Sequence, residues 1–147
     1  MGKYNILTQR EIVDKDTGEL LSYETCKQFT TKVTQDSFYM VYIDSISPLF
    51  NLTSASARNL LAWMCSNAEF NTGKIDISSA NRKEICSKFN ITNATISNNI
   101  TKLKNLKLID GDNGQYIINP KIFWKGDNKA RAELLNTKEM QIIFAIN

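Results

Sequence analysis

The segment of residues 79–119 constrains the fold of this chain more than any other, because two helical patterns are followed there by two strand patterns. The first helical pattern covers residues 80–89, with Ser78 or Ser79 available as the capping residue. Its inward positions are apolar and recur at helical spacing: Ile85, Cys86 and Phe89. The pattern breaks at residues 90–92 and then resumes, which predicts a helix-turn-helix.

The second helix is expected to open with Thr92 or Asn93 as its cap and to run to about Asn105. Its inward face is apolar: Ile96, Ile100 and Leu103. Its outward face carries no apolar side chain larger than alanine: Ala94, Thr95, Ser97, Asn98, Thr101, Lys102 and Asn105. The second helix therefore presents short hydrogen-bonding groups and a lysine to solvent.

A wing is predicted directly after the second helix. Strands are expected at residues 108–110 and 115–118, around a turn of residues 111–114 whose side chains tolerate positive φ. Residues 74–78 alternate as a short strand that can pair with this wing, and residues 55–67 read as a buried helix. The succession helix, strand, helix, helix, strand, strand is that of a winged helix.

Positive charge is concentrated on the same part of the chain. Residues 79–131 carry ten basic and four acidic side chains, whereas residues 1–78 carry seven and nine, and residues 132–147 carry one and two. Because the excess coincides with the helix-turn-helix, double-stranded DNA is the expected partner. The alternative interpretation is that this is an ordinary surface helix, since surface helices of soluble proteins are commonly polar and rich in lysine.

A helix in the major groove reads base edges with its exposed side chains, while nearby cations contact phosphates. The candidate base-reading residues lie on the outward face: Thr95, Ser97, Asn98 and Thr101. The candidate phosphate-binding residues flank that helix or follow the wing: Arg82, Lys83, Lys102, Lys104, Lys107, Lys121, Lys125, Lys129 and Arg131. Asp110 and Asp112 place negative charge at the wing tip, so we expect the cations after the wing to approach DNA instead.

Several kinds of chemistry are excluded by composition. The chain contains no histidine, so it cannot form a Ser-His-Asp or Cys-His constellation, a His-ligated zinc site or a metal-dependent nicking site built on paired histidines. It also lacks C-x-x-C spacing and a phosphate-binding glycine loop. We therefore expect no catalytic residues, no metal and no cofactor.

The expected cellular setting is a reducing cytoplasm. The three cysteines, Cys26, Cys65 and Cys86, are far apart and have apolar neighbours, which indicates reduced, buried thiols. No run approaches the ~20 apolar residues that cross a bilayer, and the first residues contain no apolar signal core. We expect no membrane contact.

Three parts are expected in an α+β chain. Residues 1–36 read as an N-terminal β-hairpin arm that turns at residues 14–18, and residues 37–131 as the winged helix-turn-helix domain. Within this domain, residues 38–43 favour a strand, and Asp44 or Ser45 can cap a short helix with Pro48 in its first turn.

Residues 132–147 form the third part, a short helical and apolar tail. A helix is expected to begin at Arg131, and the tail is unusually rich in apolar side chains: Leu134, Leu135, Met140, Ile142, Ile143, Phe144 and Ile146. They either form a homodimer contact or fold back onto their own core. For the neighbouring Phe123 and Trp124, packing on the core is favoured over base stacking.

Several motifs resemble those of the RepL family, the plasmid replication proteins of firmicute type. They are residues 13–20, residues 38–42, the helix-turn-helix and, above all, residues 116–127, where the wing ends in Asn-Pro and an aromatic pair precedes Lys-Gly. The resemblance spans roughly residues 10–135. It implies replication initiation at an origin, with recruitment of host replication proteins and no known enzymatic motif.

Two other functions are compatible with the same residues. A winged-helix transcriptional regulator would have the same core, and loss of its gene would change expression rather than plasmid maintenance. A winged-helix protein-protein interaction module would use the wing or the apolar tail, and its positive segment would be incidental.

Overall fold

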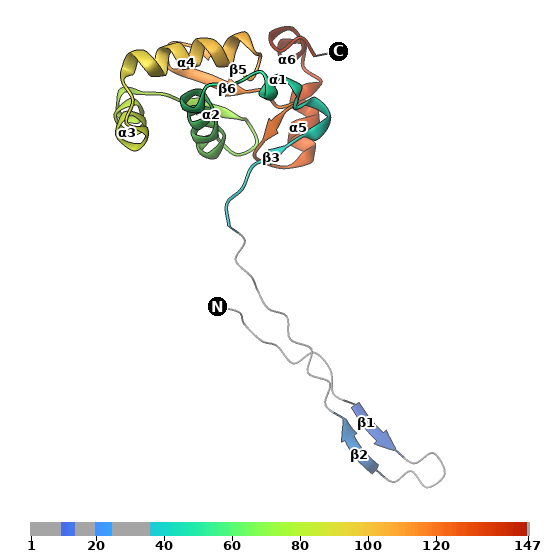
Figure 1. Cartoon of the computed structure of the whole chain (residues 1–147). Coiled ribbons are helices and arrows are strands. Elements are labelled where there is room, and N and C mark those ends of the chain that lie inside the picture. Colours follow the sequence, from blue (N-terminus) through green and yellow to red (C-terminus); the bar gives the residue numbers. More distant parts are fainter. Residues whose placement is uncertain (1–9, 14–19, 25–35, 147) are drawn as a thin grey trace. The chain divides into compact units, whose positions relative to one another are not determined.

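The computed structural model describes residues 10–13, 20–24 and 36–146, and the chain divides into two units, Met1–Ser37 and Phe38–Asn147. In the first unit, β1 (Arg10–Val13) and β2 (Leu20–Glu24) form an antiparallel pair (Figure 1). The expected hairpin arm is confirmed. Its turn at residues 14–18 and Cys26 lie outside the described residues.

Three helices of the second unit pack around a common apolar core. They are α2 (Ala55–Asn67), α3 (Ser79–Phe89) and α4 (Asn93–Asn105), each within two residues of its expected bounds. The core between them is formed by aliphatic side chains that recur at helical spacing: Leu60, Leu61, Met64, Ile85, Ile96, Ile100 and Leu103. Their burial fixes which face of α4 points outward.

The wing is a tight hairpin within a three-stranded sheet. Strands β4 (Lys74–Asp76), β5 (Ile109–Asp112) and β6 (Gln115–Ile118) lie in the order β4-β6-β5, all antiparallel. Asn113 and Gly114 both have positive φ, as a two-residue hairpin turn requires. The expected four-residue turn is therefore wrong, because an Asn-Gly pair closes the hairpin alone and Gly111 and Asp112 join the strand.

The segment before α2 differs from expectation. Strand β3 (Met40–Val41) has two residues and pairs with β7 (Phe123–Trp124). A 3₁₀ turn, η1 (Ile43–Ser45), then precedes α1 (Ser47–Phe50). Pro48 lies in the first turn of α1, but the prediction that Asp44 or Ser45 caps it is wrong, because both residues are taken up by the 3₁₀ turn.

The tail contains two helices, α5 (Asn128–Leu135) and α6 (Lys138–Ile143), which lie at the end of the unit away from α3 (Figure 1). The prediction that a helix begins at Arg131 is wrong by one turn, since α5 starts after Asp127, and the expected boundary at residues 131/132 falls inside this helix. Met140 and Phe144 are buried, so the tail folds back onto its own unit.

The aromatic pair after the wing is structural. Phe123 and Trp124 are both buried, and Trp124 Nε1 donates a hydrogen bond to the Asp127 carbonyl oxygen at 3.0 Å. Gly126 has positive φ, and a Cβ there would overlap Asn71, whose side chain bonds Asp127. The expected packing role of the pair is confirmed.

The cysteines that the structure describes are free thiols. Cys65 is fully buried in α2 and Cys86 is half-buried in α3. Burial raises the pKa of the Cys65 thiol to about 12, so this group is neutral at physiological pH. Within the described residues, no helix is both long enough and apolar enough to span a membrane.

Candidate nucleic-acid interface

Capping residues mark the start of α3, the end of α3 and the start of α4 in the helix-turn-helix. Ser78 Oγ accepts a hydrogen bond from the Asn81 amide at 3.3 Å and begins α3. Asn90 ends α3 in the left-handed conformation, with φ 52°. Thr92 Oγ1 then accepts from the Thr95 amide at 3.2 Å and begins α4, so three residues separate the two helices.

A buried amide fixes the rotation of α4 against α2. Asn99 is 2% exposed, and its Nδ2 donates a hydrogen bond to Ser56 Oγ at 3.0 Å. Sequence reasoning missed this residue, although position 99 lies three residues after Ile96 on the inward side. Because a buried amide is costly without its partner, this bond selects one orientation of the helix.

The four candidate base-reading residues have different environments. The Thr95 hydroxyl lies 3.0 Å from the hydroxyl of Thr92, within the helix cap. Ser97 Oγ accepts from Arg82 Nη1 at 3.3 Å, and Thr101 Oγ1 donates to the Ser97 carbonyl at 3.2 Å. Asn98 is exposed, and its amide has no hydrogen-bonding partner among the described residues. Asn98 is thus the best placed of the four to bond an external group.

The cations beside α4 are mostly exposed. Arg82 is half-buried and also reaches the Asn93 carbonyl at 3.5 Å, so its guanidinium is held between α3 and the start of α4. Lys83 and Lys102 are exposed, and Lys104 is half-buried. Lys107 is exposed just beyond α4, with φ 59°.

The cations after the wing are more closely tied to the fold. Lys125 Nζ donates to the Ser66 carbonyl at 2.8 Å, at the end of α2. Arg131 donates to two backbone carbonyls and lies 3.5 Å from the centre of the Tyr42 ring. Lys121 is half-buried and Lys129 is exposed on α5.

The carboxylates at the wing tip differ from expectation, because Asp110 pairs with Ile117 inside β5 and does not lie at the tip. Asp112 is exposed next to the turn and pairs with Gln115 across the hairpin. Gln115 Nε2 also donates to Asp76 Oδ1 at 3.1 Å, which brings a carboxylate of β4 to the same end. Because carboxylates repel phosphates, α4 and not the wing tip offers the surface suited to DNA.

Comparison with known proteins identifies the family. The model of a family described as Firmicute plasmid replication protein (RepL) matches residues 3–141. This chain belongs to the RepL family. The match covers most of this chain and confirms the resemblance seen in its motifs. The chain is therefore a plasmid replication protein. Comparisons with curated proteins and with solved structures find no match.

Proposed function

We propose that this RepL chain initiates plasmid replication by binding double-stranded DNA at the origin through α4 and recruiting host replication proteins there. The observation that carries the proposal is the outward face of α4. Asn98 is exposed and its amide has no hydrogen-bonding partner in the part of the chain that the structure describes, and Lys83 and Lys102 are exposed on either side of it in the sequence. A basic, polar helix face on a winged-helix scaffold is suited to the major groove.

Asn98 is the main residue proposed to read base edges. A major groove ~12 Å wide admits one helix, and an asparagine amide can bond an adenine edge through both its donor and its acceptor. Ser97 and Thr101 are exposed on the same helix and can add single hydrogen bonds to bases. Thr95 contributes less to readout, since its hydroxyl is already placed in the cap.

The cations that border α4 are the proposed ligands of DNA phosphates. Arg82 is held by Ser97 and by the Asn93 carbonyl, so it meets a phosphate without losing further side-chain freedom. Lys83, Lys102, Lys104 and Lys107 add flexible charges. Lys129 is exposed on α5, at the end of the unit away from α3 (Figure 1), and Lys125, bonded to Ser66, is the weaker candidate of these two.

The initiator proposed here acts without cutting DNA, in the cytoplasm, and as a monomer or a homodimer. Incubation with supercoiled origin DNA and magnesium or manganese should produce no open circle. A homodimer on DNA would leave a palindromic footprint with half-sites about one helical turn apart.

The proposal is tested by binding the purified protein to fragments of its own plasmid at two salt concentrations, with random DNA as competitor. We expect one fragment, containing the origin, to be retained at the higher salt. Equal, salt-sensitive binding to every fragment would contradict sequence-specific recognition, and no binding at either salt would contradict DNA binding itself.

A further inference from the structure

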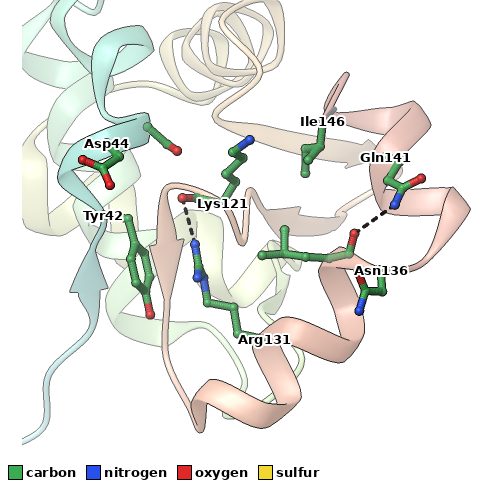
Figure 2. Close-up of a pocket in the computed structure, with 9 residues that line it drawn as sticks. Tyr42, Asp44, Lys121, Arg131, Asn136, Gln141 and Ile146 are labelled. Atoms are coloured by element: carbon green, nitrogen blue, oxygen red, sulfur yellow. Dashed lines mark hydrogen bonds between the residues drawn. The ribbon is translucent and has the colours of Figure 1, made fainter.

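A pocket of about 590 Å³ lies at the end of the second unit that carries α5 and α6, outside the outward face of α4. Tyr42 and Asp44 lie on one side, Gln141 and Ile146 on the other, and Lys121 and Arg131 between them (Figure 2). This volume is within the ~300–1,000 Å³ range of small-molecule sites. None of the DNA contacts proposed for α4 involves this pocket.

Two backbone carbonyls and an aromatic ring hold Arg131 in this pocket. Its Nε donates to the Pro120 carbonyl at 2.7 Å, and its Nη2 donates to the Lys121 carbonyl at 3.2 Å. One face of the guanidinium is covered by the Tyr42 ring, with 3.5 Å between Cζ and the ring centre. Two carbonyls and a ring hold the group in one orientation.

These contacts orient the guanidinium without neutralising it. Carbonyl oxygens and an aromatic ring carry no net charge, and two of the five guanidinium N–H groups are used by the carbonyls. The remaining N–H groups are available to an anion. A planar, pre-oriented guanidinium is the side chain best suited to the paired oxygens of a phosphate.

The other lining groups favour an anion with polar substituents. Lys121 supplies a second positive charge, against the single carboxylate of Asp44. Ser45, Asn136 and Gln141 add neutral hydrogen-bonding groups, which suit a sugar or a base rather than a purely apolar ligand.

We propose that this pocket binds the phosphate of a nucleotide, with Arg131 and Lys121 as its cationic ligands. The nucleotide comes either from solution or from a DNA strand, and both present the same phosphate chemistry. The proposal goes beyond the α4 interface and does not depend on it, because inorganic phosphate alone can test the pocket.

The test is a titration of the full-length, ¹⁵N-labelled protein with sodium phosphate at constant ionic strength, followed by NMR. We expect saturable shifts of the Arg131 Nε–H signal and of the Lys121 amide. Lys121→Gln should weaken binding about ten-fold, the size of one charge-assisted contact. Lys138→Gln is the matched control, since Lys138 is exposed on α6, does not line the pocket and should leave affinity unchanged.

Linear shifts, or equal effects of the two variants, would overturn the phosphate site. Titrations with dAMP and with a DNA duplex then separate the two sources. A free nucleotide predicts tighter binding of dAMP than of phosphate, and a DNA strand predicts that DNA shifts the same signals and that Lys121→Gln lowers DNA affinity. If neither compound moves the Arg131 signal, the assignment to nucleotides is wrong even if α4 binds DNA.

Discussion

Two basic regions of this protein use the same residue types in different ways. Beside α4, Lys83 and Lys102 are exposed, and Asn98 has no partner among the described residues. After the wing, Lys125 and Arg131 donate hydrogen bonds to backbone carbonyls, and Arg131 also stacks on Tyr42. Positive charge alone therefore does not identify a DNA contact, because hydrogen bonds to the fold decide where each cation is held and which ligand it can meet.

The largest expected difference between the two regions is in stability. Arg131→Ala removes two charged hydrogen bonds and a cation-π contact, and should lower the free energy of unfolding by about 2–3 kcal/mol. Lys102→Ala, at an exposed position, should change it by less than about 0.5 kcal/mol. Urea unfolding of both variants measures the two changes in the free energy of unfolding. Equal changes would contradict the expected difference between the two regions.

A smaller effect is expected on specific recognition. Asn98→Ala should cost about 1–3 kcal/mol of binding to the origin site and much less on random DNA, if Asn98 bonds a base edge. Competition binding against both DNAs measures the two losses. Equal losses on origin and random DNA would show that Asn98 reads no base.

The smallest expected effect is on salt dependence. Lys102→Ala should lower the slope of log affinity against log salt concentration by about 1, because one phosphate contact is lost. Lys125→Ala is the matched variant and should change this slope less, since Lys125 Nζ is bonded to Ser66. A larger change of slope for Lys125→Ala than for Lys102→Ala would contradict the expected difference between the two regions.

A charge-reversal variant separates DNA binding from partner binding. Lys102→Glu together with Lys104→Glu should abolish DNA binding through repulsion of phosphates. Circular dichroism shows whether the fold is kept. If plasmid replication survives this double change in a folded protein, a protein-protein module becomes the better interpretation of the winged helix.

Local signals were sufficient to predict the helix-turn-helix. Ser78, Asn90 and Thr92 act within their own turns, so their capping roles follow from neighbouring sequence. The wing was predicted from the same kind of signal, but its turn was placed too broadly, since Asn113 and Gly114 suffice to close it.

Contacts between distant segments could not be predicted in this way. The bond from Asn99 to Ser56 and the stack of Arg131 on Tyr42 join residues far apart in the chain. A sequence pattern indicates that Asn99 lies near the buried side and that Arg131 is positive, but not which group each one meets. The environments of Lys125 and Arg131 required the structure for the same reason.

The most direct measurement is dimethyl sulfate probing of guanine N7 on the fragment that the protein retains, because N7 lies in the major groove. We expect protected guanines within the site for the wild-type protein, and no protection with the Lys102→Glu, Lys104→Glu variant. A fragment that is bound with no change at any guanine of its site would contradict placement of α4 in the major groove.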